Sequence, residues 1–275
     1  MLHYIRTEKE LDSGLRLIEG HDEYMVDCET SGLSPFKNEL LLLQVGTREH
    51  QLVVDVYQTT KEVIQKIRPI IGDKLIVGHN IKFDLKFLKV HMGWEFENVF
   101  DTMIADKLIY AGYPMSYRFG LKHTLWRHLK VKVDKDTRKE FIDAKYGAGF
   151  SGEAIEYSGK DVEFLLDVKE TQTVLINRLN LKSVTDLEMA TLPALARVEL
   201  NGFRLDVEGW RDLIKDAEHE AEALKTELNS MVSHLTDEEV NWNSPKQVVF
   251  MINAYQDEVT VQSSAKDVLE KLAHI

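Results

Sequence analysis

Residues 25–33 read MVDCETSGL and place two acidic side chains, Asp27 and Glu29, at the end of an apolar run. The pattern predicts a strand, in which residues two apart face the same side of the sheet. Asp27 and Glu29 therefore project together, whereas Cys28 projects to the opposite face as a core residue. Neighbouring carboxylates repel each other, and their burial costs free energy unless a cation compensates it. The stretch indicates either a solvated strand end or a cation site.

The surrounding pattern predicts an α/β domain with a mixed central sheet and helices on its faces. Strands are expected over residues 23–29, 39–46, 50–56 and 74–79, and the short GTRE connection indicates an antiparallel hairpin of the second and third. Helices are expected over residues 60–71, 81–91, 102–112 and 152–179. Asp101 immediately precedes the third of these helices, so we expect it to cap that helix.

The pattern changes to helix throughout beyond residue 180. Apolar residues recur at spacings of three and four from Trp210 to Leu235, which predicts one long amphipathic helix. We therefore expect two domains, an α/β domain over residues 1–180 and a small all-helical region over residues 181–275.

Composition limits the possible compartments and cofactors. The 275-residue chain is 44% hydrophobic, which is ordinary for a globular protein. It contains no apolar run long enough to span a membrane, and its first residues lack the pattern of a secretion signal. The single cysteine, Cys28, excludes an intramolecular disulfide and a zinc site built from several cysteines. We expect a soluble protein of a reducing compartment, without a membrane partner.

The net charge of −12 argues against a general-purpose duplex binder. The charge is uneven, with eleven acidic and three basic residues over residues 206–240, but nine basic and four acidic over residues 117–145. Both stretches are compatible with solvated faces. If the chain contacts nucleic acid, the basic stretch is the expected place.

Two further segments pair an acidic residue with a polar one on a helix. VGHNIKFDLKFL places Asn80 and Asp84 four residues apart, and EYSGKDVEFLLDV places Tyr157 and Asp161 four apart. Residues at this spacing share one helical face. With the first motif, the chain offers four carboxylates from three separate elements. Such a set of oxygen ligands suits two hard divalent cations.

These three segments resemble the motifs of the DEDD superfamily of 3′–5′ exonucleases, whose fold resembles ribonuclease H. Tyr157 stands four residues before Asp161, as in the tyrosine subtype, whereas Glu156 occupies the position at which the histidine subtype carries its histidine. The resemblance implies that the catalytic residues are Asp27, Glu29, Asp84, Tyr157 and Asp161.

Later segments are similar to family A DNA polymerases. DTMIADKLI resembles the segment between the second and third motifs of their proofreading domains. LEMATLPALARVELNGFRLD, NWNSPKQVVFMI and SSAKDVLEKLA resemble the beginning of the polymerase thumb. No palm or fingers follow, so this chain should not synthesise DNA.

The resemblance implies a two-metal site. Asp27, Glu29 and Asp161 would hold one ion, and Asp27 would bridge to a second ion near Asp84. Mg²⁺ or Mn²⁺ suits these oxygen ligands. Two such ions can stabilise both the attacking and the leaving oxygen, and the products would be nucleoside 5′-monophosphates. Tyr157, a poor base at neutral pH, would orient the attacking water together with Glu29.

Substrate contacts follow from the same resemblance. Asn80 matches a position that contacts the terminal nucleotide in this family, while Leu33 and Phe83 match positions that pack on the last bases. A core role for Phe83 stays open. The expected substrate is single-stranded DNA or a frayed 3′ end, in the cytoplasm of a bacterial or virus-infected cell.

Three alternatives stay open. An RNA-trimming exonuclease of the ribonuclease D type shares all three motifs. A catalytically silent module that binds nucleic acid or a polymerase would usually have lost one of the metal acids. The chain also fits either the front part of a longer polymerase or a separate exonuclease that works with a DNA polymerase chain.

Overall fold

The computed structural model describes residues 1–114, 116–132, 140–142, 144, 146–147, 149–255 and 260–272. They belong to two units, Met1–Gly202 and Phe203–Ile275, and each unit is considered by itself.

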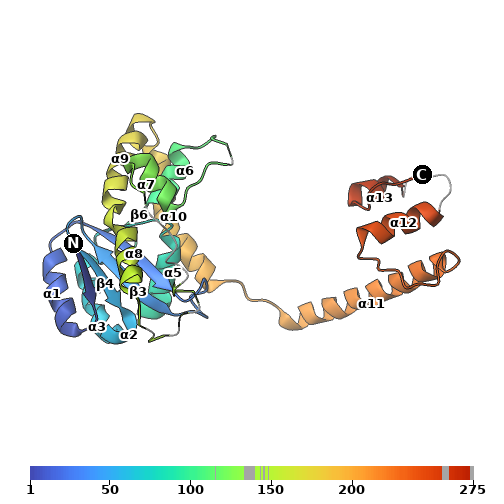
Figure 1. Ribbon diagram of the computed structural model, residues 1–275, viewed down its shortest axis with the longest axis horizontal. Coiled ribbons are helices and arrows are strands. Elements are labelled where there is room, and N and C mark those ends of the chain that lie inside the picture. Colours follow the sequence, from blue (N-terminus) through green and yellow to red (C-terminus); the bar gives the residue numbers. More distant parts are fainter. Residues whose placement is uncertain are drawn as a thin grey trace. The chain divides into compact units, whose positions relative to one another are not determined.

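A six-stranded mixed sheet forms the centre of the first unit (Figure 1). Its strands are β1 (Leu2–Ile5), β2 (Glu23–Thr30), β3 (Leu40–Gly46), β4 (Gln51–Asp55), β5 (Leu75–Gly78) and β6 (Val99–Asp101), in the spatial order β1-β4-β3-β2-β5-β6. The predicted hairpin is confirmed because β3 pairs with β4 antiparallel. Strand β2 pairs with β3 antiparallel and with β5 parallel, so it lies inside the sheet.

The register of β2 fixes the two acids of the first motif. Asp27 lies opposite Gln44 of β3, and Glu29 lies opposite Leu42. The pairing shifts between Glu29 and Thr30, where the ladder becomes irregular. Cys28 is buried in the large hydrophobic core, as the alternation of the strand predicts.

Helices cover the sheet and extend beyond it (Figure 1). The longer ones are α1 (Glu8–Ile18), α5 (Lys82–Met92), α6 (Thr102–Ile109), α7 (Leu121–Leu129), α8 (Gly152–Glu163), α9 (Leu165–Arg178) and α10 (Lys182–Asn201). Helix α8 crosses the sheet and contacts β1, β2, β3 and β4, whereas α9 contacts β2 and β5. The large core includes side chains of α1, α5 and α9, and a smaller cluster lies under α8.

Two of the predicted helices are interrupted. Residues 60–71 form α3 (Lys61–Ile64), η1 (Gln65–Ile67) and α4 (Arg68–Ile71), after the separate turn α2 (Val56–Thr59). Thr60 has a φ of 70°, which excludes a regular helix at that residue. Residues 152–179 form α8 and α9, because Phe164 leaves helical geometry at φ −110° and ψ 4°.

The first strand and helix have no counterpart in the sequence-based prediction. β1 pairs parallel with β4 at the edge of the sheet. Helix α1 starts with a capping box, in which the Thr7 side chain accepts from the Glu10 N–H and the Glu10 carboxylate accepts from the Thr7 N–H. A four-residue strand at the chain start shows too little alternation to be recognised.

The boundary between the units lies after Gly202, about one helix later than the predicted position near residue 180. Helix α10 packs on α5 and β6 through Met189, Leu192 and Ala196, which belong to the large core. Glu199 of this helix also pairs with Lys82 and, at 2.7 Å, with Lys86 of α5. The amphipathic pattern of α10 does not tell which domain its apolar face contacts.

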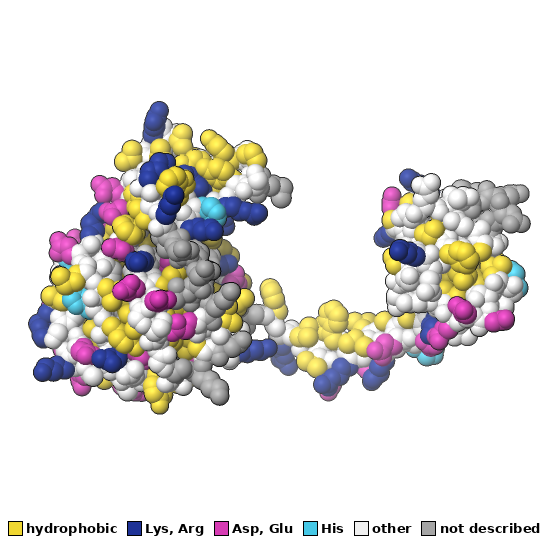
Figure 2. Space-filling view, in the orientation of Figure 1, with side chains coloured by type: hydrophobic (Ala, Val, Ile, Leu, Met, Phe, Trp, Pro, Cys, Tyr) yellow, Lys and Arg dark blue, Asp and Glu magenta, His cyan; other side chains and the backbone are white. Residues whose placement is uncertain are grey.

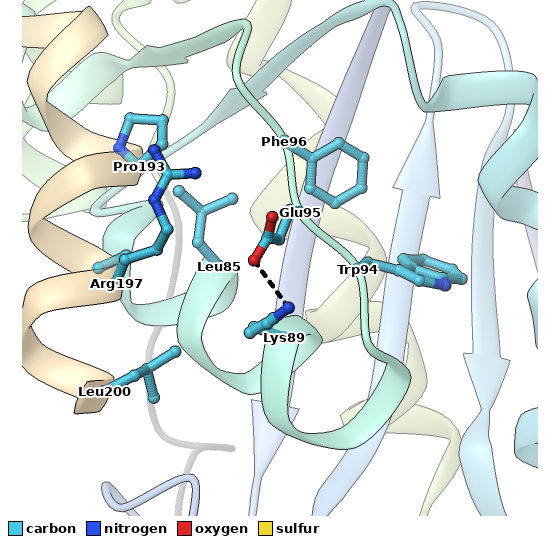
Figure 3. Close-up of a pocket in the computed structure, with 9 residues that line it drawn as sticks. Leu85, Lys89, Trp94, Glu95, Phe96, Pro193, Arg197 and Leu200 are labelled. Carbon is cyan, nitrogen blue, oxygen red and sulfur yellow. Dashed lines mark ion pairs between the residues drawn. The ribbon is translucent and has the colours of Figure 1, made fainter.

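A cavity of about 20 Å³ lies between α5 and α10 (Figure 3). Leu85, Pro193 and Leu200 line it, and Lys89 pairs with Glu95 at 2.7 Å near its edge. This volume holds about one water molecule and is too small for a nucleotide. The cavity is thus a packing feature of the α5–α10 contact.

The second unit is helical, as predicted. It contains α11 (Val207–Val232), α12 (Pro245–Tyr255) and α13 (Lys266–Leu272). Val232 of α11, Met251 of α12 and Val240 between them form a small hydrophobic cluster. Helix α11 matches the long amphipathic helix of the sequence pattern. Among the described helices of both units, none combines the length and hydropathy that a membrane crossing requires. Similarity of this unit to a polymerase thumb stays a prediction.

Candidate functional site

Three carboxylates meet where β2 and α8 approach each other. Asp27 and Glu29 of β2 and Asp161 of α8 each offer an oxygen, and these oxygens all lie within 4.8 Å of one another. Glu29 and Asp161 are only 8% and 4% exposed, whereas Asp27 is half-buried. Because three anions at this separation repel strongly in a partly buried site, the arrangement calls for a cation.

Helix α8 reaches the acids because it packs closely on the sheet. Ser151 caps its first turn by accepting the Ala154 N–H at 3.1 Å. At Gly159 an added Cβ would lie 2.1 Å from Leu2 Cδ1, so only glycine permits this contact without a shift of Leu2. Two residues later, Asp161 meets the acids of β2.

Tyr157 lies one turn before Asp161 on the same helix. Its side chain is 4% exposed and belongs to the cluster under α8, with Leu41, Leu42 and Val53 as members. This packing fixes the ring against the sheet. The predicted spacing of Tyr157 and Asp161 therefore places both on the helix face that covers β2, β3 and β4.

Asp84 lies on the first turn of α5 and is 2% exposed. Burial, followed by the charge of Asp27, raises the pKa of its carboxyl well above the usual range; Asp101 and Glu29 act in the same direction. Its Oδ1 is buried and has no hydrogen-bond partner in the structure as described. Asp84 is thus a neighbour of Asp27, outside the group of three oxygens that lie within 4.8 Å.

Asp101 holds the residues that lead into α5, the helix that carries Asp84. Its carboxylate accepts from the N–H groups of Met103 and Ile104 and so caps α6, as predicted. It also accepts from the N–H of Asn80 at 3.0 Å and of Ile81 at 2.9 Å. Asn80 has a φ of 64°, a conformation that asparagine tolerates better than most residues. The sequence analysis did not predict the contact of Asp101 with Asn80 and Ile81, since the residues it joins lie 20 and 21 positions apart.

Cys28 adjoins this site without offering a thiolate. Burial raises the pKa of the thiol well above its ordinary value, and the charges of Asp84 and Asp27 raise it further. A neutral, buried thiol is a poor metal ligand. Cys28 also projects to the face opposite Asp27 and Glu29, so the three side chains that converge at this site offer carboxylate oxygens.

The residues fit a hard divalent cation. Their donors are all oxygens, which suit Mg²⁺, Mn²⁺ or Ca²⁺ better than softer metals. The unpartnered, buried oxygen of Asp84 is a second indication, because buried polar atoms without a partner are rare.

The substrate residues predicted from the resemblance occupy contrasting environments. Leu33 is 84% exposed, on the loop between β2 and β3. That loop is held by His91, whose Nε2 lies 3.1 Å from the carbonyl oxygens of Pro35 and Asn38. Asn80 is also exposed, whereas Phe83 is half-buried with its ring 4.9 Å from that of Phe87. Phe83 therefore contributes to packing, and Leu33 is free to contact a ligand.

Helix α7 presents a basic face with one exposed aromatic ring. Lys122 and Trp126 are exposed on α7, Arg118 and Lys130 are exposed just before and just after the helix, and α7 contains no acidic residue. Lys130 and Lys132 lie 5.7 and 5.4 Å from the centre of the Trp126 ring. Figure 2 shows Lys and Arg side chains gathered over the upper part of the first unit. Residues 133–139 of the predicted basic stretch lie outside the described residues.

Arg127 is turned away from this face. It pairs with the buried Asp106 at 3.2 Å, and its guanidinium lies 4.3 Å from the centre of the Tyr117 ring. His128 also contacts Asp106, at 2.7 Å. This cluster anchors α7 on α6, so it holds the exposed cationic face in place.

The first unit has the fold of ribonuclease H-like exonucleases. Brucella melitensis NrnC bound to pGG matches 75% of this chain and 95% of its own, at 22% identity and a TM-score of 0.61. Escherichia coli RNase D, an exoribonuclease involved in structured RNA processing, matches 78% of this chain and 54% of its own, at 20% identity and a TM-score of 0.61. At these identities the similarity defines the fold alone.

Sequence similarity defines the family. Residues 2–176 match the profile of the 3′–5′ exonucleases of the DNA polymerase A type. DNA polymerase I of Aquifex aeolicus is 30% identical over 80% of this chain and 38% of its own length. DNA polymerase DpoZ of Salmonella phage PMBT28 is 26% identical over 87% of this chain and 40% of its own. The chain belongs to this 3′–5′ exonuclease family, as its motifs predict, and spans about two fifths of these polymerases.

Proposed function

We propose that the chain is a two-metal-dependent 3′–5′ exonuclease that releases nucleoside 5′-monophosphates from the end of single-stranded DNA. The observation that carries this proposal is the convergence of Asp27, Glu29 and Asp161 within 4.8 Å, with Asp84 beside them. A catalytically silent binding module is disfavoured because all four acids and Tyr157 are present together.

Asp27, Glu29 and Asp161 would hold one Mg²⁺ or Mn²⁺, and Asp84 with Asp27 would hold a second. When bound, such ions supply positive charge that neutralises the phosphate oxygens and increases the acidity of a water molecule. The family is divalent-metal dependent; the number and identity of the ions are part of the proposal.

The protein's own residues would position the reactants. We assign the Tyr157 hydroxyl and the Glu29 carboxylate to the orientation of the attacking water, since Tyr157 is held by the cluster under α8. Leu33 would pack on the terminal base through its exposed side chain. Asn80 would contact the terminal nucleotide, and Phe83 would support the adjoining base from its half-buried position.

Metal binding should stabilise the folded protein measurably. At a concentration one hundred times Kd, a ligand that binds only the folded state adds about 2.7 kcal/mol. We therefore expect Mg²⁺ or Mn²⁺ to raise the melting temperature by several degrees, and Asp27→Ala to remove most of this shift. Differential scanning fluorimetry in EDTA and in each metal measures it. Equal shifts in wild type and Asp27→Ala would contradict the proposed site.

DNA is the favoured substrate because 80% of the chain is similar to a DNA polymerase I at 30% identity. The exposed basic face of α7 suits a phosphate backbone, and Trp126 suits stacking of an unpaired base. RNA is the second candidate, because the solved structures with this fold include an exoribonuclease.

Rates on single-stranded DNA and RNA of one sequence separate the two substrates. We expect the labelled DNA to be shortened faster than the labelled RNA, with 5′-labelled oligonucleotides, Mg²⁺ and identical salt. Faster release from RNA would favour the ribonuclease alternative while leaving the metal site intact. Release of labelled monophosphate from a 5′ end would contradict the 3′–5′ direction.

A DNA polymerase chain is the proposed partner, with the apolar face of α11 as the contact. Trp210, Leu213, Ile214 and Leu224 are about half exposed on this helix in the second unit. The similarity to polymerases covers residues of this unit too, since it includes 87–89% of the chain in several of them. This role in proofreading places the protein, as part of the proposal, in the cytoplasm of a bacterial or virus-infected cell.

Co-purification with the cognate polymerase tests this contact. Leu213→Glu should abolish co-purification and leave hydrolysis of free single-stranded DNA unchanged. Failure of the wild-type protein to bind the polymerase would overturn the partner proposal without affecting the exonuclease proposal.

A further inference from the structure

Gln44 is a buried amide at the centre of the sheet, and the function described above does not use it. It lies in the middle of β3 and has no exposed surface. Among the residues that the structure describes, neither its Nε2 nor its Oε1 has a hydrogen-bond partner. An amide can donate two hydrogen bonds and accept others, so a buried glutamine with none requires an explanation.

The register of the sheet places Gln44 directly opposite Asp27. Residues opposite each other on antiparallel strands project to the same face, with Cβ atoms about 4.5–5.5 Å apart. The Gln44 side chain therefore lies on the same face of the sheet as the Asp27 carboxylate, which would bind both metal ions. Its three side-chain torsions allow the amide to reach a neighbouring group on that face.

Helix α8 covers this face and closes it to solvent. It contacts β2, β3 and β4, and its residues 157–159 are all buried. The hydroxyl of Ser158 donates to the Ala154 carbonyl oxygen at 2.9 Å, so its proton is not available to Gln44. Val53, the other residue opposite Gln44, is apolar. Asp27 is thus the polar side chain that the strand register places next to the amide.

We propose that Gln44 is a positioning residue for Asp27, and that its Nε2–H donates to the Asp27 carboxylate when a divalent ion is bound at the carboxylate cluster. Groups that hydrogen-bond to metal ligands fix their orientation and tune their affinity for the metal. A glutamine suits this position because its donor is neutral. Lysine or arginine there would bring a positive charge that competes with the ion. The inference rests on the proposed metal site.

Gln44→Met tests the proposal because methionine matches the length of glutamine and lacks the amide. In EDTA the melting temperature of this variant should equal or exceed that of wild type, since two unsatisfied buried polar atoms disappear. Mn²⁺ affinity, measured by isothermal titration, should fall about 10- to 100-fold. The kcat on single-stranded DNA should fall at subsaturating Mn²⁺, with KM for the oligonucleotide unchanged.

Gln172→Met is the matched control. Gln172 is equally buried, on α9, and its Nε2 donates to the Thr102 carbonyl oxygen at 2.8 Å. This control should lose thermal stability in EDTA and keep the Mn²⁺ affinity of wild type. We therefore expect Gln44→Met to lose metal affinity and keep its stability, and Gln172→Met to lose stability and keep its metal affinity.

Two results would overturn the positioning role: wild-type Mn²⁺ affinity in Gln44→Met, or a loss of stability in EDTA as large as that of Gln172→Met. The second result would assign Gln44 a structural partner instead. A wild-type protein that binds no Mn²⁺ would overturn the proposed function together with this inference. Normal wild-type binding with an unaffected Gln44→Met would overturn the inference alone.

Discussion

Asp161→Ala is expected to lose at least about a thousandfold of the exonuclease rate, because it removes a carboxylate from the group that would hold the metal. The measurement is the stepwise shortening of 5′-labelled single-stranded DNA in saturating Mg²⁺. Tyr157→Phe should keep metal binding and lose about a hundredfold, since it removes only the hydroxyl that would orient water.

Glu156 provides the matched control on the same helix. It is exposed and lies five residues before Asp161, at the position of the histidine in the other subtype. Glu156→Ala should therefore retain the wild-type rate within about twofold, because surface substitutions away from special contacts change little. Full activity in Asp161→Ala, or equal losses in Asp161→Ala and Glu156→Ala, would contradict the assigned roles.

Asp84→Asn is expected to be more stable than wild type in metal-free buffer near pH 8, and to be inactive. Burial and the charge of Asp27 raise the pKa of the Asp84 carboxyl in the folded state above its ordinary value of 3.8. Below that value the group is protonated in both states, so it does not disfavour folding. Between 3.8 and the raised pKa, the folded state keeps the proton whereas the unfolded state releases it. Stability is therefore lost as pH rises through this window.

Asparagine at position 84 carries no charge to bury, so the variant escapes this loss. Its advantage in melting temperature should be small at pH 4 and reach about 5 °C or more at pH 8 in EDTA. Mg²⁺ should narrow the difference, because wild type would bind both ions whereas the variant lacks the Asp84 ligand of the second ion. An advantage that does not change with pH, or a variant that is less stable at pH 8, would contradict the buried-charge account.

Much of the first unit could be predicted because short-range chemistry determines it. The alternation in β2 predicted that Asp27 and Glu29 share a face while Cys28 enters the core. The polar residue before an apolar helical pattern predicted the cap by Asp101. In each case the side chain acts within a few residues of its own position, so a local pattern contains the necessary information.

The sequence-based predictions were wrong where contacts between residues far apart in the chain determine the structure. The break at Phe164 separates α8, which lies on the sheet, from α9, which packs on α6 and α7, and helical spacing alone does not mark it. The unit boundary was misplaced because α10 packs on α5. Similarly, the contact of Asp101 with Asn80 and the position of Gln44 opposite Asp27 depend on strand pairing. Neither is visible in the sequence around those residues.

The anomalous difference density of a crystal soaked in Mn²⁺ tests the central claim most directly. We expect one peak about 2 Å from oxygens of Asp27, Glu29 and Asp161, and a second peak beside Asp84. Mn²⁺ bound elsewhere, or no peak among these carboxylates at saturating Mn²⁺, would contradict the proposed metal site and the exonuclease mechanism built on it.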